Sequence, residues 1–402
     1  MLKDVGRLFL TLGLFAAQNA LAAEPIKVGV PIALSPPGAV SQGTQIKDAL
    51  EVSAKLINDA GGVLGRPIVL IIEDDQGIPE KSRAAVEKLI TLDQVVALVG
   101  GHQSSVVLAG IEVAHRYHIP YINTNAWADA IRQKNYQEVF NPSPYNSLPA
   151  IGLAAAVKAL AAKRVVTLVE NTDFGIGLGK GIGDQLAQTT AGLDYKYITL
   201  DRTAKDLLPA LLPLKAAPPD VVIDVMLPPA AYLLINQLYE QGIAPSAKTW
   251  LFETATGDYP DFWKNVSDGG NLLVAFGPYH PQMGLPELGR KVAAAYKTKT
   301  GFDPNRLLFQ ASDSLFVLAE AIKNGKSTAP DAVIKALEAL RWTGTRGEIT
   351  FSEEKNDYRY HQWIDMPYVF YQYTAVNQPL ADSRVIKDVG RPFDVSRLIR
   401  PK

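Results

Sequence analysis

The feature that most constrains the fold is a regular alternation of short apolar runs with segments of helical periodicity. The apolar runs, which we predict to be strands, are Ile26–Ala33, Pro67–Glu73, Val95–Gly100 and Ile119–Thr124. The segments between them, which we predict to be helices, are Gln45–Ala60, Glu80–Thr91 and Ser104–Tyr117. Because the strands are apolar along their whole length, both faces of their sheet must be covered, as in parallel βαβ units. The sequence therefore predicts an α/β fold.

The pattern stops at Phe140–Pro149, where prolines and asparagines disfavour a helix, and then starts again. The second series of predicted strands is Arg164–Glu170, Val221–Met226, Thr249–Glu253 and Leu272–Phe276. This repetition predicts two similar lobes joined by a crossing segment.

A second break follows at Gly277–Pro281. The predicted elements after it are helices over Glu287–Thr300, Leu307–Asn324 and Asp331–Leu340, and strands over Gly347–Phe351 and Pro367–Thr374. Helices with no strand between them are expected to complete the cover of a sheet that already exists. These later elements therefore need not belong to the lobe that precedes them.

The first 22 residues have the pattern of a secretory signal peptide. Lys3 and Arg7 precede an apolar run, Leu8–Ala17, that is too short to span a bilayer. Ala20 and Ala22 then form a cleavage signal before residue 23. The chain contains no cysteine, so neither a lipid anchor on cysteine nor a disulfide framework is expected. We expect a free, soluble protein in the periplasm.

The charges are balanced, which excludes some classes of partner. There are 40 Lys and Arg residues against 41 Asp and Glu residues, for a net charge of −1. A protein that neutralises phosphates needs a basic surface, and no basic block occurs here. Neither nucleic acid nor a charged membrane surface is therefore an expected partner.

A glycine-rich segment, Phe174–Gly183, follows a predicted strand and opens a helix, which is where a dinucleotide-binding motif would lie. The spacing is wrong for that motif, because Lys180 and Ile182 stand where the third glycine is required. The glycines are instead expected to allow a tightly packed helix start. No nucleotide cofactor is expected.

No other motif indicates catalysis or a metal. Glu112 and His115 share one face of a predicted helix and His118 follows three residues later, but the chain has only five histidines and they are scattered. Neither a nucleophile elbow nor a zinc-protease motif occurs. We expect a protein that is not an enzyme and holds no cofactor or metal.

Polar residues gather where two neighbouring predicted strands end. Ser104 and Ser105 begin a helix after Gly100, and Thr124, Asn125 and Trp127 follow the next strand. The amide groups and positive dipole end of a helix start attract anions, and ligands bind at the carboxyl ends of parallel strands. We therefore expect a carboxylate site here. The alternative is that the serines only cap the helix.

At these residues the chain resembles the type I periplasmic solute-binding proteins of the Leu/Ile/Val-binding family, which serve branched-chain amino acid ABC importers. The resemblance covers nearly the whole chain after the signal peptide. Its most specific part is the segment Leu56–Asp75, in which a helix, two glycines, a strand and two acids follow one another. Its other parts are IKVGVPIALSPPGAV, VVALVGGHQSSV, IPYINTNA and RVVTLVENTDFGIGLG.

The resemblance implies two Rossmann-like lobes with parallel central sheets, joined by a three-segment hinge. The first lobe would comprise residues 23–143 and 279–358, and the second residues 144–278 and 359–402. The hinge segments would lie near Asn141–Tyr145, Gly277–Pro281 and Arg359–Trp363. We then expect a monomer that closes on a small molecule and does not react with it. The closed protein would deliver the molecule to an ABC permease in the inner membrane.

The resemblance also implies a ligand site. A carboxylate would lie at Ser104 and the segment 125–127, which includes Ala126. His102, Gln103 and Ser105 would surround it. In members that bind amino acids, a threonine of this same segment and an acid of the second lobe hold the ammonium group. Trp127 stands at that threonine position, and the acid position falls at Glu253 or Thr254.

Two aromatic positions of the family also differ, because Phe174 and Gln42 stand where the family has tyrosines. A buried ammonium group without acceptors is costly, so these changes favour a carboxylate with an aromatic or apolar body. Trp127 and Phe174 would sandwich that body from opposite lobes. The alternatives are a branched-chain amino acid whose ammonium group binds Glu253, an amide ligand, or a sensor of the same fold.

Overall fold

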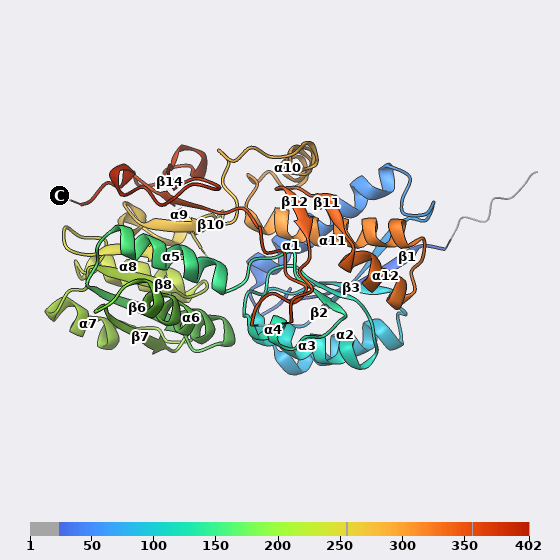
Figure 1. Cartoon of the computed structure of the whole chain (residues 1–402), viewed down its shortest axis with the longest axis horizontal. Helices are drawn as coiled ribbons and strands as arrows, with labels where there is room; N and C mark the ends of the chain where they lie inside the picture. The colour runs from blue at the N-terminus through green and yellow to red at the C-terminus, as the bar shows by residue number, and fades with distance from the viewer. Residues whose placement is uncertain (1–23, 255, 356, 402) are drawn as a thin grey trace, which may run out of the picture.

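The structure, a computed structural model, describes residues 24–401 apart from 255 and 356, so the predicted signal peptide lies outside the described residues. The described chain forms two α/β bodies that lie side by side in Figure 1. No helix among these residues combines the length and apolar character needed to span a membrane.

The first body, here called the first lobe, is built on a parallel sheet with the strand order β2-β1-β3-β4-β5. Its strands are β1 (Ile26–Ile32), β2 (Ile68–Asp74), β3 (Ala97–Gly100), β4 (Tyr121–Asn123) and β5 (Val139–Phe140). The helices between them are α1 (Val40–Asp59), α2 (Pro79–Thr91), α3 (Ser104–Arg116) and α4 (Ala130–Gln133). The predicted order of strands and helices in this region is confirmed.

The second lobe has a sheet with the strand order β14-β13-β10-β9-β8-β6-β7. Its parallel strands are β6 (Arg164–Glu170), β7 (Asp194–Leu200), β8 (Val221–Val225), β9 (Trp250–Glu253) and β10 (Val274–Gly277). Two antiparallel strands, β13 (Val369–Gln372) and β14 (Arg384–Lys387), extend its edge. The helices are α5 (Ser147–Ala159), α6 (Asp173–Thr189), α7 (Leu208–Ala216), α8 (Ala230–Glu240) and α9 (Phe262–Asn265), with short 3-10 turns at Asp268–Gly270, Leu380–Asp382 and Val395–Arg397.

The glycines of α6 bring this helix close to its sheet, as expected. A Cβ atom at Gly175 would come within 2.2 Å of the Glu170 carbonyl oxygen. A Cβ atom at Gly179 would come within 2.7 Å of the Val169 side chain. Both distances are shorter than real Cβ contacts, so the segment serves packing.

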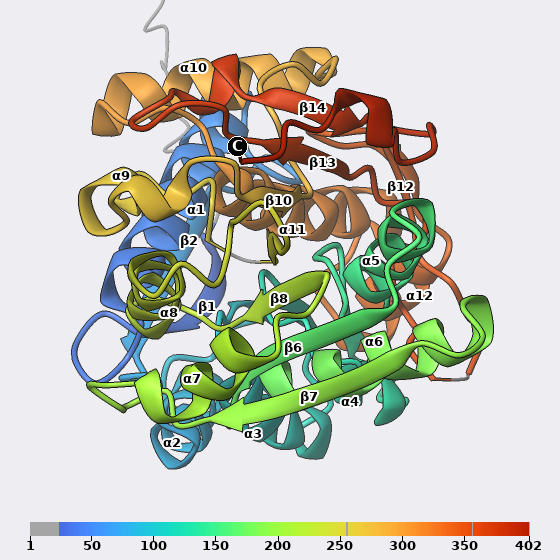
Figure 2. The same ribbon diagram turned by 90° about the vertical axis from the view of Figure 1, so that its left-hand side faces the viewer.

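After β10 the chain returns to the first lobe. Helices α10 (Glu287–Thr300) and α11 (Arg306–Gly325) lie there beside α1, and α12 (Pro330–Glu338) packs against α11 (Figures 1 and 2). The Ser53 hydroxyl of α1 and the Ser312 hydroxyl of α11 are 2.9 Å apart. The later helices thus cover an existing sheet, as predicted. The predicted strand Gly347–Phe351 is shorter in the structure, where β12 (Glu348–Thr350) forms a separate two-stranded sheet with β11 (Arg341–Thr343).

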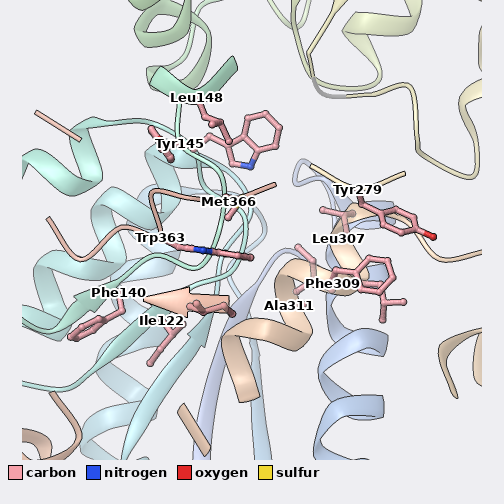
Figure 3. Packing of buried hydrophobic residues seen from close by; sticks show 14 of the residues in the cluster. Ile122, Phe140, Tyr145, Leu148, Tyr279, Leu307, Phe309, Ala311, Trp363 and Met366 are labelled. Atoms are coloured by element: carbon pink, nitrogen blue, oxygen red, sulfur yellow. The ribbon is translucent and has the colours of Figure 1, made fainter. Parts of the chain in front are cut away.

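The chain crosses between the lobes three times, after β5, after β10 and after β12. The predicted three-segment hinge is therefore present, while the residue boundaries of the lobes stay a prediction. The expectation that the whole of Phe140–Pro149 is a non-helical crossing segment is wrong in part, because Ser147–Pro149 belongs to α5. Pro149 is tolerated there because the first turn of a helix needs no donor from it. In Figure 3, Trp363 and Met366 lie between Tyr145 and the helix start at Leu307.

Two buried arginines connect the crossing segments. The guanidinium group of Arg346 pairs with Asp313 at 3.1 Å and also donates to the carbonyl oxygens of Pro278 (3.2 Å) and Pro142 (3.5 Å). Arg132 donates to the Gln362 side chain (2.8 Å) and to the Pro144 carbonyl oxygen (3.0 Å). These contacts hold the three crossing segments against one another.

Candidate functional site

The start of α3 lies at the carboxyl end of β3, as the sequence indicated. The chain turns there through Gly101, whose φ of +92° a side chain rarely adopts. The residue that caps α3 is Gln103, and its side chain makes no capping hydrogen bond. The Ser104 hydroxyl instead accepts a hydrogen bond from the Ala128 N–H at 3.1 Å. The alternative that the serines only cap the helix is therefore wrong for Ser104.

Residues of both lobes enclose a narrow cavity beside Ser104, here called the inner cavity. Its lining consists of His102, Ser104, Asn125, Trp127, Phe174, Leu227 and Arg306. Its volume is about 10 Å³, which is space for about one water molecule, so the lining residues almost close it. The sequence placed five of these seven residues in the candidate site, and missed Leu227 and Arg306.

The buried polar atoms of this lining that lack a hydrogen-bond partner among the described residues include His102 Nδ1, Asn125 Oδ1 and Trp127 Nε1. The other ring nitrogen of His102 is 3.4 Å from the Tyr259 hydroxyl of the second lobe. Burial, with smaller contributions from Arg306 and Arg202, lowers the pKa of His102 to about 3. His102 is therefore a neutral hydrogen-bonding group at physiological pH.

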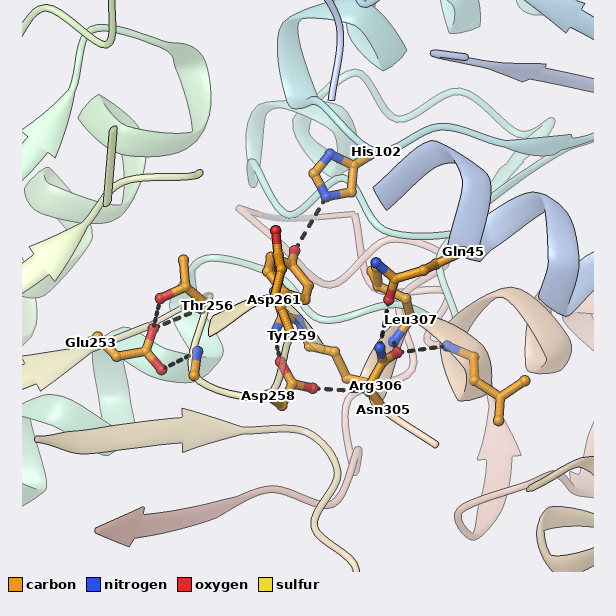
Figure 4. Close-up of polar contacts among 12 residues, drawn as sticks. Gln45, His102, Glu253, Thr256, Asp258, Tyr259, Asp261, Asn305, Arg306 and Leu307 are labelled. Carbon is orange, nitrogen blue, oxygen red and sulfur yellow. Dashed lines mark hydrogen bonds and ion pairs between the residues drawn. The ribbon is translucent and has the colours of Figure 1, made fainter. Parts of the chain in front are cut away.

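Arg306 is the cation of the inner cavity. It is the first residue of α11 and pairs with Asp258 of the second lobe, both through its guanidinium group and through its N–H to Asp258 Oδ2 at 2.9 Å (Figure 4). Its guanidinium carbon lies 4.3 Å from the ring centre of Tyr259 and 5.7 Å from that of Trp127. Burial alone would lower the pKa of Arg306, but Asp258 raises it overall, so the group stays charged.

The sequence around Arg306 contains one local feature that indicates a buried ion pair. A charged residue stands directly after Asn305 and before the apolar run Leu307–Phe309. Asn305 caps α11, because its side chain accepts hydrogen bonds from the N–H groups of Leu307 and Leu308. A charge at a helix start among buried apolar residues indicates a buried ion pair. Its partner Asp258, which lies 48 residues earlier in the chain, is not marked by any comparable sequence pattern.

Trp127 and Phe174 meet across the lobes, but they do not form the expected sandwich. Their ring centres are 6.0 Å apart and their planes make an angle of 79°, which is an edge-to-face contact. Trp127 makes a second contact of this kind with Phe276, at 6.1 Å. A flat group cannot lie between two rings that already touch, so Trp127 and Phe174 form adjoining walls of the cavity.

Four predicted site residues line neither the inner cavity nor the outer cavity described below. Gln42 is buried in α1, and Ala126 uses its N–H and carbonyl groups to bind Asn123. The Glu253 carboxylate accepts hydrogen bonds from the N–H groups of Thr256 (2.7 Å) and Gly257 (2.8 Å). The Thr254 hydroxyl donates to the Asp224 carbonyl oxygen at 3.1 Å. Glu253 thus shapes its own loop, which the sequence could not reveal.

A second cavity of about 70 Å³, here called the outer cavity, adjoins the first and shares Ser104, Phe174 and Leu227 with it. The first lobe adds Gly77, Pro79, Gln103, Ser105 and Val106, and the second lobe adds Glu170, Thr172 and Arg202. The two oxygens of Glu170 accept hydrogen bonds from the Thr172 hydroxyl (2.6 Å) and the Leu227 N–H (2.9 Å). Within the described ranges, no group of His, Asp and Glu side chains is arranged to hold a metal ion.

Comparison with known proteins gives the family. The family model described as periplasmic binding protein matches residues 25–375. Leu/Ile/Val-binding protein homolog 7 of Brucella abortus (strain 2308) is 26% identical over 252 residues, which are 59% of this chain and 61% of that protein. The chain thus spans about three fifths of the length of this curated relative.

Two solved structures have the same fold. A leucine-binding protein from Thermotoga maritima has a TM-score of 0.79 at 19% identity, covering 93% of this chain and 100% of that one. An ABC transporter solute-binding protein from R. palustris, in complex with benzoate, has a TM-score of 0.76 at 19% identity, covering 92% and 97%. The chain therefore belongs to the periplasmic binding protein family, with the type I fold of its Leu/Ile/Val-binding members.

Proposed function

We propose that this protein is the periplasmic solute-binding component of an ABC importer and that it binds a small carboxylate with an aromatic or otherwise apolar body. The ligand would lie between the lobes, with its carboxylate near Ser104. Because the described lining of the inner cavity includes no acidic side chain, an ammonium group would have no anion there. This is the observation that carries the preference for an acid over an amino acid.

The rest of the lining supports the same ligand class. Trp127, Phe174 and Leu227 give apolar walls, which suit an apolar body. His102 Nδ1 and Trp127 Nε1 are buried and lack partners among the described residues, and a buried polar atom without a partner costs free energy. A bound polar group or water would relieve that cost.

The similar proteins represent two ligand classes, amino acids and aromatic acids. One of the two similar structures is named a leucine-binding protein, and the other was solved with benzoate. The amino-acid alternative requires an acid that faces the ligand. Glu253 makes its hydrogen bonds to its own loop, which favours the acid class over the amino-acid class.

Binding would work by closure of the hinge. A ligand stabilises the closed arrangement only to the extent that it contacts the second lobe, here through Phe174 and Leu227. Closure would expel water from the narrow inner cavity, and the permease would then recognise the closed form. No bond is made or broken in this sequence of steps.

The test is a calorimetric titration of the mature protein with benzoate, benzamide and leucine. Benzoate is expected to bind with the highest affinity, because the amide lacks the charge and leucine adds an ammonium group. An excess of ligand of about 100 times Kd should also add about 2.7 kcal/mol to the free energy of unfolding. Strong binding of leucine, with none of benzoate, would overturn the proposal.

A matched pair of variants locates the site. Phe174→Ala removes a side chain of the inner cavity that is 5% exposed, whereas Phe302→Ala removes one that is 53% exposed and lies outside both cavities. We expect the first variant to lose affinity for benzoate and the second to keep it. Equal affinities would place the ligand elsewhere.

A further inference from the structure

We propose that Arg202 of the second lobe recognises the negative charge of the ligand, by pairing with an anion held at the start of α3. The proposal rests on the proposed function and goes further, because it names the residue that makes closure depend on a carboxylate. It also restricts the ligand to acids with one negative charge.

Arg202 lies in the turn that follows β7. Its N–H donates to the Asn171 side chain at 3.2 Å, which fixes the turn beside the end of β6. Its side chain lines the outer cavity together with Ser104 and Ser105 of the opposite lobe. A group bound at these serines therefore lies in the cavity that Arg202 lines.

The charge of Arg202 has no counter-ion in the described part of the chain: its half-buried side chain makes no hydrogen bond or ion pair there. The charge of Arg306, by contrast, is balanced by Asp258. The influence of Arg202 reaches into the site, because it contributes, after burial and Arg306, to the lowered pKa of His102. Arg202 thus brings to the outer cavity a positive charge from the second lobe that makes no ion pair among the described residues, although the lining also includes the Glu170 carboxylate, which is hydrogen-bonded to Thr172 and Leu227.

The first lobe provides the complementary surface. Helix α3 begins without a side-chain cap, so its first amide groups have no intrahelical acceptor and its dipole favours an anion. The Ser104 hydroxyl accepts from the Ala128 N–H and still has its own proton to donate. His102 Nδ1, on a side chain only 6% exposed, adjoins Ser104, lacks a partner within the described residues and can donate to an anion when it carries the ring proton.

A carboxylate at α3 would therefore receive hydrogen bonds from the first lobe and an ion pair from the second. Only the second contact changes on closure, so Arg202 would convert the presence of a negative charge into a closed hinge. Glu170 lines the same cavity and would repel a second negative charge. This arrangement favours monocarboxylates over dicarboxylates.

The test compares Arg202→Gln with the wild-type protein, using benzoate and benzamide as probes in calorimetric titrations. We expect the variant to bind benzoate about tenfold more weakly and benzamide equally well, since only the acid interacts with the charge. Arg202→Lys should restore most of the affinity for benzoate. Arg397→Gln, an exposed change outside both cavities, is the matched control and should behave as the wild-type protein.

The outcomes separate this inference from the proposed function. If the wild-type protein binds benzoate and Arg202→Gln binds it equally well, the role of Arg202 is refuted while the function stands. Equal weakening of benzoate and benzamide would also refute it, because that result indicates a structural role. If the wild-type protein binds neither probe, the proposed function itself fails.

Discussion

The ion pair between Arg306 and Asp258 gives the sharpest test of how the two lobes are held together at the site. Each side chain is 2% exposed, and Asp258 accepts hydrogen bonds from both the guanidinium group and the N–H of Arg306. Asp258→Asn keeps the size of the side chain and removes its charge. The buried Arg306 charge would then lose the carboxylate that contributes most to keeping it charged.

The expected loss is large because the pair is buried. Removing one partner of a buried ion pair costs about 3–5 kcal/mol, since the remaining charge pays desolvation without compensation. The pair Lys55 and Asp59, 2.7 Å apart on α1 with side chains 74% and 59% exposed, is the matched control. Asp59→Asn should cost no more than about 0.5 kcal/mol, because water screens exposed pairs.

The measurement is urea-induced unfolding followed by circular dichroism, with the free energy extrapolated to water. Arg306→Met and the double variant complete a thermodynamic cycle, and the double variant should lose less than the sum of the single losses. The reasoning is refuted if Asp258→Asn loses no more stability than Asp59→Asn. Additive losses in the cycle would likewise show that the two groups do not interact.

The remaining predictions concern pH, the hinge and the helix start. Burial lowers the pKa of His102 to about 3 and those of His280 and His361 to about 4, so the unfolded chain binds protons that the folded chain does not. Each histidine should therefore lower the free energy of unfolding by about 2 kcal/mol between pH 7 and pH 5, as urea titrations can measure. Burial also raises the pKa of Asp75 to about 6, which offsets part of this loss; equal stability at both pH values would contradict the expectation. Arg346→Met should destabilise the protein by about 3–5 kcal/mol in the same assay, because Asp313 stays buried and loses its counter-ion, whereas exposed Arg341→Met should change little. Ser104→Ala should weaken benzoate binding in calorimetry and cost about 1–3 kcal/mol of stability, because the Ala128 N–H loses its acceptor; a variant with unchanged affinity would remove Ser104 from the site.

Much of the fold was predictable because its signals are local. Strands such as Arg164–Glu170 are apolar along their length, and their boundaries in the structure agree with the prediction. The N-terminal end of α5 was missed because a proline is acceptable in the first turn, where it resembles a proline in a loop. Strand β7 was not predicted individually, since as an edge strand with several exposed residues it lacks the apolar signature of its neighbours.

The sequence by itself determined the two-lobed α/β architecture, the return of the later helices to an existing sheet, and the polar residues at the start of α3. Each of these depends on periodicity or on residues adjacent in the chain. Only the tertiary structure decided that Arg306 meets Asp258, that Arg202 shares a cavity with Ser104, and that Glu253 binds its own loop. The physical reason is that the relative position of the two lobes depends on contacts among three crossing segments, which lie far apart in the chain and leave no local pattern. That position determines which side chains of one lobe face those of the other.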